Sequence, residues 1–354
     1  FCTTRCAYCS FVSHSIQNAK KLIPEYIFYL CKEIEIISEI VKKYNLIVDT
    51  IYFGGGTPSL MEVSSIDKII QTARKCFDMP KNAEITLETN PRTLNANKME
   101  SLINCGVNRL SIGVQSCVDT ELKTLGRNHT FNDCKNMVAT ARKVGFENIS
   151  CDLMIGTSYQ TMDTLKYSCE NISKLDIKHI SSYMLKVEEN TPYSSNNDIL
   201  SNLPSEDIVS DMYLKSVEIF KSFGYNQYEI SNFAVPGYES KHNLKYWNCE
   251  EYLGIGPAAH SYMNGKRFYY ERDIDAFING APPRFDCEGG SYEEWLMLKL
   301  RLREGVKRLE LLRPETIEKA RNEILKPYVI LDDEGLRLTH RGFLVSNTVI
   351  SELI

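Results

Sequence analysis

Three cysteines at the start of the chain have a spacing that suits iron–sulfur chemistry. They form the pattern Cys2-x-x-x-Cys6-x-x-Cys9, so three thiols fall within eight residues and must share one loop. Three thiolates can bind three irons of a [4Fe–4S] cluster and leave the fourth iron without a protein ligand. The amino and carboxylate groups of S-adenosylmethionine (SAM) can bind this open iron, with the sulfonium beside the cluster for one-electron cleavage. We therefore predict a [4Fe–4S] site at Cys2, Cys6 and Cys9.

A structural zinc site is the alternative for the same loop. Zinc takes four ligands in a tetrahedron, and His14 follows the three cysteines closely enough to be the fourth. The remaining nine of the twelve cysteines are scattered singly. Several of them lie in helix-like stretches, where a free cysteine is usually a small buried hydrophobe. This usage indicates a reducing compartment, and we expect a cytoplasmic location.

Polar residues and glycines recur where strand-like segments end. Gly54-Gly55-Gly56-Thr57-Pro58 directly follows one such segment, and glycines there let the backbone approach a ligand. Glu88, Gln115 and Asp152 close three later segments. Each of these alone has a structural explanation, but their succession predicts one ligand site. Arg127 supplies a guanidinium fork that can pair with the SAM carboxylate.

The elements that must position these residues alternate regularly. Strand-like segments lie near residues 48–53, 84–89, 108–114, 148–154 and 178–185, and helical patterns lie near 24–44, 64–77, 96–105, 131–144 and 161–174. Strands that alternate with helices predict parallel βα units, because a parallel strand needs a long crossover. With one more strand expected just before Cys2, the chain predicts an α/β fold, a partial (β/α)6 barrel with its chemistry at the carboxyl ends of the strands.

The pattern changes in the second half of the chain. A helix near 205–223 and a strand near 226–230 lead into a region rich in Gly and Pro from 236 to 290, of which 281–290 has the composition of a connector. Residues 291–354 predict a small α+β unit. We therefore divide the chain into a barrel, 1–232, and a C-terminal region, 233–354.

Composition excludes some classes of partner. The chain has 354 residues, a net charge of −5 and 43% hydrophobic residues. No global basic field is present to hold nucleic acid, and no uncharged apolar run is long enough to span a bilayer. We expect neither nucleic-acid binding nor stable membrane insertion.

Taken together, the motifs resemble those of the radical SAM superfamily and, within it, the oxygen-independent coproporphyrinogen III oxidase group. The segments that carry this resemblance are Gly54-Gly55-Gly56-Thr57-Pro58-Ser59, Glu88-Thr89-Asn90-Pro91 and Arg109-Leu110-Ser111-Ile112-Gly113-Val114-Gln115-Ser116. The resemblance implies that SAM is contacted by Gly55, Gly56, Thr57, Glu88, Gln115, Arg127, Asp152 and Lys186. One departure is Gly156-Thr157-Ser158-Tyr159-Gln160-Thr161, where the group usually has Gly-Leu-Pro-x-Gln-Thr, and we expect an altered loop there.

Two features resemble the HemW-type branch of this group, whose members are regarded as haem chaperones. The oxidase branch has a fourth cysteine two residues after the third, whereas this chain has Phe11. The segment 242–247 is similar to the branch's haem-binding motif H-N-x-x-Y-W, which implies haem contacts by His242, Asn243, Tyr246 and Trp247. A neutral imidazole is a good axial ligand for haem iron, and aromatic rings offer flat faces to a porphyrin. His260 is an alternative ligand.

The resemblance implies a haem chaperone that uses a [4Fe–4S] cluster and SAM, binds haem or a porphyrin, and passes haem to a haem-accepting protein. An electron donor for the cluster is a further expected partner, and a homodimer is left open. Two alternatives stay open as well. One is oxygen-independent coproporphyrinogen III dehydrogenase in porphyrin biosynthesis, and the other is a zinc-stabilised binding protein without redox chemistry.

Overall fold

The centre of the computed structural model is a seven-stranded sheet. All residues from 1 to 354 are described, except for the side chain of Asn18. The strand order is β1-β2-β3-β4-β5-β7-β6. The first five strands are parallel and β6 and β7 are antiparallel. Their bounds are β1 Thr50–Phe53, β2 Glu84–Thr89, β3 Arg109–Gln115, β4 Asn148–Ile155, β5 His179–Met184, β6 Asn226–Gln227 and β7 Asn232–Ala234. The five predicted parallel strands are confirmed, whereas the strand predicted near 226–230 is limited to Asn226–Gln227. The sheet extends two residues past the barrel boundary predicted at 232.

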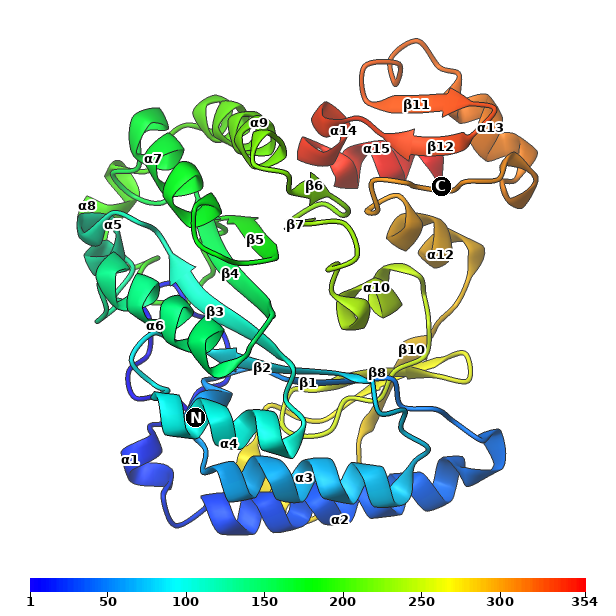
Figure 1. Ribbon diagram of the computed structural model, residues 1–354. Coiled ribbons are helices and arrows are strands. Elements are labelled where there is room, and N and C mark those ends of the chain that lie inside the picture. Colours follow the sequence, from blue (N-terminus) through cyan, green and yellow to red (C-terminus); the bar gives the residue numbers. More distant parts are fainter.

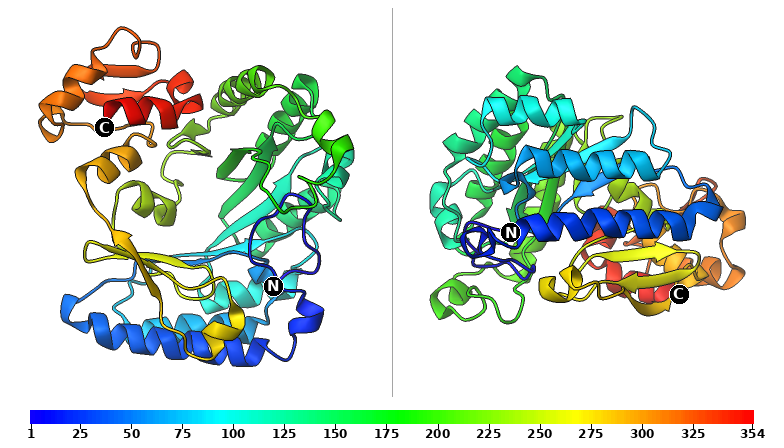
Figure 2. Two further views of the ribbon diagram at one scale, coloured as in Figure 1. Left: turned by 180° about the vertical axis from the view of Figure 1, so that it is seen from behind. Right: turned by 90° about the horizontal axis from the view of Figure 1, so that it is seen from below.

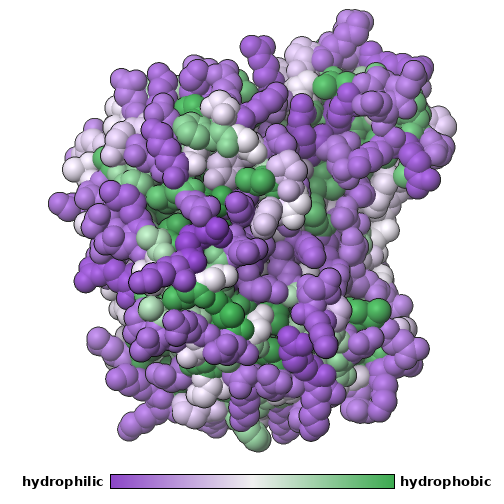
Figure 3. Space-filling view, viewed as in Figure 1, coloured by the Kyte–Doolittle hydropathy of each residue, from purple (hydrophilic) through white to green (hydrophobic). Residues whose placement is uncertain are grey.

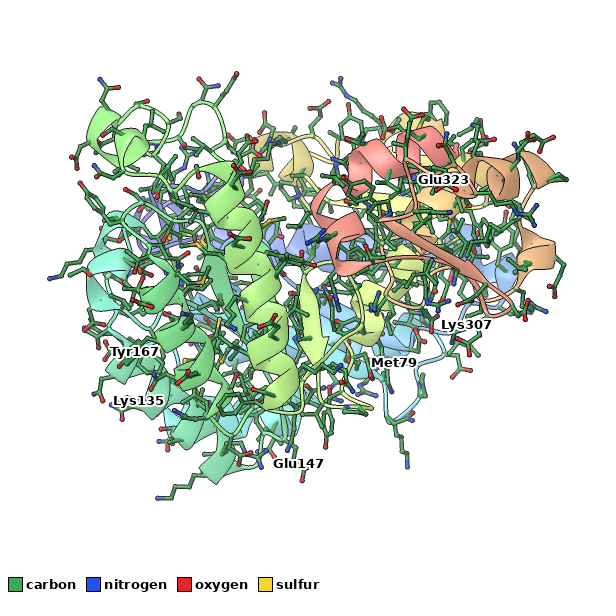
Figure 4. The ribbon with its side chains drawn as sticks, turned by 90° about the horizontal axis from the view of Figure 1, so that it is seen from above. Met79, Lys135, Glu147, Tyr167, Lys307 and Glu323 are labelled. Atoms are coloured by element: carbon green, nitrogen blue, oxygen red, sulfur yellow. The ribbon has the colours of Figure 1, made fainter. Side chains whose placement is uncertain are left out.

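Helices cover the outer face of this curved sheet (Figures 1 and 2). They are α2 Ile23–Val41, α3 Val63–Cys76, α4 Ala96–Cys105, α6 Phe131–Val144, α7 Met162–Ser173 and α9 Glu206–Ser222. Local sequence fixes their ends. For example, Thr130 and Asp133 form a capping box before α6, and Gly145 ends that helix in the left-handed region at φ 111°. Exposed residues of these helices, such as Lys135 and Tyr167, lie at the outer surface (Figure 4).

The two faces of the sheet differ in polarity. Alternate strand residues such as Ile85, Leu87 and Leu110 are fully buried against the helices. The residues between them point to the concave inner face. These are Thr50, Tyr52, Glu84, Thr86, Glu88, Arg109, Ser111, Ser150, Asp152, His179, Ser181 and Tyr183. Parallel strands buried on both faces are normally apolar on both. The inner face of this sheet is therefore built for polar chemistry.

The Gly- and Pro-rich region is more ordered than its composition predicts. Helix α10 (Lys241–Trp247) lies on the concave side of the main sheet, and α11 (Ile274–Ile278) contacts α2. A three-stranded antiparallel sheet comprises β8 His260–Met263, β9 Lys266–Tyr269 and β10 Arg284–Glu288. The interpretation of 281–290 as a connector was thus wrong. Pro282 and Pro283 precede β10 instead of interrupting it, and β10 is an exposed edge strand, where such flanking residues are tolerated.

The C-terminal unit packs beside the barrel and matches the predicted α+β pattern (Figure 1). It contains α12 Tyr292–Lys299, α13 Pro314–Ala320, β11 Val329–Asp332, β12 Gly335–Leu338, α14 His340–Leu344 and α15 Ser346–Leu353. The remaining short helices are α1 Ile16–Ala19, α5 Asp119–Thr124 and α8 Asn197–Ser201, with single 3-10 turns at 42–44, 58–60 and 309–311. Among the described helices, none combines the length and apolarity that crossing a membrane requires. Hydrophilic residues dominate the face shown in Figure 3, with hydrophobic residues in broken patches.

Candidate functional site

The cysteine loop is attached to the main sheet by backbone hydrogen bonds at its carboxyl ends. The N–H of Thr57, just after β1, donates to the carbonyl of Phe1 at 2.8 Å. The N–H of Ala7 donates to the carbonyl of Leu125 at 3.1 Å. At Gly56 a side chain would collide with Phe1, since its Cβ would lie 2.7 Å from that residue's backbone nitrogen. The glycine motif thus lets the loop lie directly on the end of β1.

A chain of polar contacts links two of the three cysteines. The Cys2 Sγ lies 3.5 Å from the Thr57 Oγ1, which accepts a hydrogen bond from the Asn90 Nδ2 at 3.0 Å. The Asn90 Oδ1 accepts from the Arg127 Nη2 at 2.6 Å, and the Arg127 Nη1 donates to the Cys6 Sγ at 3.2 Å. The chain fixes Cys2 and Cys6 relative to each other. Asn90 is a site residue that the sequence did not single out.

Arg127 is held by its surroundings at the end of β3. Its Nη2 also donates to the carbonyl of Gly113 at 2.5 Å, while its buried Nε has no partner among the described residues. A Cβ at Gly113 would lie 2.7 Å from the Arg127 Nη2 and 2.9 Å from the Gln115 Nε2. Gln115 itself lies in the left-handed region at φ 71°, at an irregularity in the β3–β4 pairing. Glycine at 113 and the bulge therefore bring Arg127 and Gln115 together.

Two carboxyl groups face this region from the inner side of the sheet. Glu88 accepts hydrogen bonds from the Tyr52 hydroxyl at 2.9 Å and from the Gly55 N–H at 3.0 Å. Removal from water raises the pKa of Glu88 to about 7. Asp152 accepts from the Ser111 hydroxyl at 3.3 Å, and removal from water raises its pKa to about 6. Both carboxyls gain from a cation such as an ammonium group, which would restore their charged form.

Replacing Glu88 by glutamine should change how stability depends on pH. In the wild type the folded state holds the Glu88 proton up to about pH 7, whereas the unfolded chain releases it near its ordinary pKa of 4.5. Stability from this group is therefore present at low pH and lost as the pH rises toward 7. Relative to the wild type, we expect the free energy of unfolding of E88Q to rise by about 1–3 kcal/mol as the pH is raised from about 5 to about 8. Urea unfolding of both proteins measures this difference. A difference that does not change with pH would contradict the assignment.

Two other predicted features lie apart from this cluster of residues. The Lys186 side chain is 82% exposed and its Nζ pairs with Glu188 at 2.9 Å. Its contact with SAM stays a prediction. In the loop 156–161, the Gly156 N–H donates to the Gln160 Oε1 at 2.7 Å, and the Gln160 Nε2 donates to the Met154 carbonyl at 3.1 Å. Gln160 thus hydrogen-bonds the backbone at the start of the loop that lacks the usual proline.

The three thiols on one loop could hold a [4Fe–4S] cluster, in which each thiolate binds a different iron. Across the residues that the structure describes, no three His, Cys, Asp or Glu side chains are grouped so as to hold one metal ion. The half-buried thiols on one loop, with the guanidinium of Arg127 beside Cys6, suit this anionic cluster.

His242 lies at the opposite, amino-terminal end of the sheet. Ser240 caps the N-terminus of α10, and the Glu84 Oε1 accepts from the His242 N–H at 3.1 Å. The imidazole stacks on Tyr52 with ring centroids 5.1 Å apart. Its Nδ1 lies 2.8 Å from the Thr50 Oγ1 and its Nε2 lies 2.7 Å from the Tyr246 hydroxyl. Burial lowers the pKa of His242 to about 4, so this imidazole is neutral.

His260 has a different environment. It is exposed at the start of β8 and stacks on Tyr269 with ring centroids 5.4 Å apart. It pairs with Tyr269 across the three-stranded sheet β8–β10. His260 and His242 therefore have different ring partners.

Comparison with known proteins shows the superfamily and the family of this chain. A model of the radical SAM superfamily matches residues 1–172. The chain is 33% identical to a Lactococcus lactis protein named heme chaperone HemW, in an alignment that covers 100% of this chain and 95% of the relative. A Bacillus subtilis protein of the same name is 34% identical, with coverage of 100% and 97%. The chain belongs to the HemW family. Membership of the radical SAM superfamily implies a [4Fe–4S] cluster and SAM.

The chain shares its fold with a solved enzyme. The structure of Escherichia coli coproporphyrinogen III oxidase, HemN, superposes with a TM-score of 0.82 at 18% identity, covering 100% of this chain and 88% of that one. This confirms the predicted partial barrel. A bovine relative, 32% identical over 73% of this chain, is named as mitochondrial. The cytoplasmic location therefore stays a prediction.

Proposed function

We propose that this protein is a radical SAM haem chaperone, which binds haem and passes it to a haem-accepting protein. The observation that carries the proposal is the full-length similarity to proteins named heme chaperones. Phe11 also supports the proposal, because the oxidase branch has a fourth cysteine at this position. Phe11 is 62% exposed and follows the cysteine loop. An electron donor that reduces the cluster is part of the proposal.

The residues of the candidate site have distinct tasks in this proposal. Cys2, Cys6 and Cys9 would hold the cluster, which supplies one electron to the SAM sulfonium when both are bound. Arg127 is close enough to Cys6 to balance the charge of the thiolate, and its unpartnered Nε can receive the SAM carboxylate. Glu88, whose pKa is raised by burial, is suited to pair with the SAM ammonium. Gly55 has no neighbour within 4 Å of where a Cβ would stand, which leaves room for a ligand.

We propose His242 as the axial haem ligand, with Asn243, Tyr246 and Trp247 as haem contacts. In the tautomer that carries its proton on Nδ1, the imidazole donates to the Thr50 Oγ1 and keeps its Nε2 lone pair for an acceptor role. A hydrogen bond from the far nitrogen is how proteins usually orient a histidine ligand. The Tyr246 hydroxyl occupies that lone pair in this structure, so haem iron would replace a hydroxyl contact. Because burial holds the pKa of His242 near 4, no proton competes with iron at neutral pH.

An anaerobic product assay separates the chaperone from the porphyrinogen enzyme. Both branches share the barrel motifs, so the motifs themselves do not decide. Cluster-loaded protein is incubated with coproporphyrinogen III, SAM and a reductant, and the products are measured by mass spectrometry. We expect no protoporphyrinogen, together with transfer of bound haem to apomyoglobin in the same preparation. Steady formation of protoporphyrinogen would overturn the chaperone proposal in favour of the dehydrogenase.

A further inference from the structure

Arg109 is a buried cation without a counter-ion. It is the first residue of β3, its side chain points to the inner face of the sheet, and the residue is 2% exposed. Its one side-chain hydrogen bond runs from Nη1 to the Thr86 Oγ1 at 3.5 Å, and its Nε is buried with no partner among the described residues. Among the described residues, no carboxylate lies within 4.0 Å of this guanidinium, whereas Arg142, Arg267 and Arg313 each have one.

The nearby carboxyl groups are already occupied by other partners. Glu88 accepts from Tyr52 and Gly55, and Asp152 accepts from Ser111. Glu84 on the same inner face accepts from two N–H groups of α10, those of Lys241 and His242. None of these groups neutralises Arg109 directly.

The neighbouring histidines are neutral as well. His179 lies between the Ser150 hydroxyl at 2.7 Å and the Tyr228 hydroxyl at 2.8 Å. Burial and the positive charge of Arg109 lower the pKa of His179, whereas burial, then Lys245 and then Arg109 lower the pKa of His242. Neither imidazole supplies a negative charge to Arg109.

Burying such a charge is costly unless something pairs with it. An ion that is buried without a partner costs several kcal/mol, and a guanidinium has five N–H donors to satisfy. Its planar fork matches a carboxylate, which can accept two parallel hydrogen bonds. The buried guanidinium of Arg109 is therefore suited to bind an anion, and its planar fork favours a carboxylate.

This anion site is distinct from Arg127. Gly113, whose carbonyl binds Arg127, is four residues further along β3, which corresponds to about 13 Å of strand. Arg109 lies toward His242 and α10, on the side of the sheet away from the cysteine loop. Tyr183 faces the same inner surface and is 43% exposed, so this face is open to solvent near Glu88 and Asp152.

We propose that Arg109 binds a propionate carboxylate of the haem whose iron is held by His242. The proposal rests on the haem-chaperone function and adds to it a site that selects the acid form of the ligand. SAM also has a carboxylate, which is the other candidate partner for the Arg109 guanidinium.

The test compares haem with its dimethyl ester, in which both propionates are neutral. Each is titrated anaerobically into cluster-loaded, full-length protein: the wild type, Arg109→Gln and a control, Arg303→Gln. Arg303 is a half-buried arginine whose side chain donates to the Leu338 carbonyl in the C-terminal unit instead of facing the main sheet's ligand residues. We expect the wild type and R303Q to prefer haem over the ester by about ten- to hundredfold. In R109Q this preference should fall to about twofold or less through weaker binding of haem.

The outcomes separate the two proposals. If the wild type binds neither compound, the haem-chaperone function fails. If it binds both and R109Q keeps the preference, the assignment of Arg109 fails alone. If R109Q loses SAM retention in equilibrium dialysis but keeps the preference, the carboxylate is that of SAM and the propionate assignment is overturned.

Stability without ligand gives a second measurement. Removing an unpaired buried cation should leave the ligand-free protein as stable as the wild type or more stable. A cation that holds the fold together would instead cost stability when it is removed. Urea unfolding of Arg109→Gln and Arg109→Met measures this. A marked loss of stability in both variants would contradict the anion-binding role.

Discussion

Replacing Cys6 by alanine should abolish the [4Fe–4S] cluster, with total loss of its visible absorption and of acid-labile sulfide after anaerobic reconstitution. Each of the three thiolates is expected to hold a different iron, so two remaining cysteines leave two irons without a protein ligand. The Cys6 Sγ also accepts a hydrogen bond from Arg127, and its removal leaves that guanidinium without one of its partners. We expect the same loss for the corresponding variants of Cys2 and Cys9.

Cys31→Ala is the matched control for the cluster prediction. Cys31 is a buried residue of α2 that packs in the main hydrophobic core, so its replacement should leave iron and sulfide content unchanged. Zinc without sulfide in the wild-type protein would contradict the cluster. The zinc-stabilised alternative would then account for the cysteine loop.

Replacing His242 by alanine should accelerate haem loss at least about tenfold, because the axial ligand disappears. Haem loss is followed in the Soret region with excess apomyoglobin as a trap. Tyr246→Phe should have the opposite effect, slowing haem loss by about two- to tenfold, because the phenol that competes for the Nε2 lone pair is gone. His260→Ala should leave the rate unchanged, since its ring stacks on Tyr269 and makes none of the contacts of His242.

A rescue experiment separates ligation from folding in His242→Ala. The imidazole also contacts Thr50 and stacks on Tyr52, so its removal can loosen α10. Free imidazole added to the variant should restore the imidazole-ligated haem spectrum if His242 is the ligand. Faster haem loss from His260→Ala, with His242→Ala unchanged, would move the ligand to His260.

Much of the fold follows from sequence periodicity. The strand β2, for example, has alternating residues that separate the core, with Ile85 and Leu87, from the inner face, with Thr86 and Glu88. Helix α6 has the bounds predicted from its pattern, with Thr130 as its N-cap and Gly145 as its C-cap. By contrast, β10 was missed because Pro and Gly on both sides of it have the composition of a connector. Cross-strand pairing with β9 outweighs that local signal.

The site was predictable only where a motif names the residue. The cysteine spacing and the strand-end residues Glu88, Gln115 and Asp152 could be found from the sequence. The role of Asn90 could not, because it arises from contacts with Thr57 and Arg127, which lie 33 and 37 residues away. Arg109 was likewise indistinguishable from any charged residue at the start of a strand. Only the assembled sheet shows that no carboxylate among the described residues pairs with the Arg109 guanidinium.

The central claim is that this chain binds haem as a specific ligand. The most direct measurement is an anaerobic haem titration of the cluster-loaded wild-type protein, followed in the Soret region. We predict saturation at about one haem per chain at micromolar haem, with the spectrum of an imidazole ligand. Absorbance that rises without saturation, or no haem-dependent change, would contradict it.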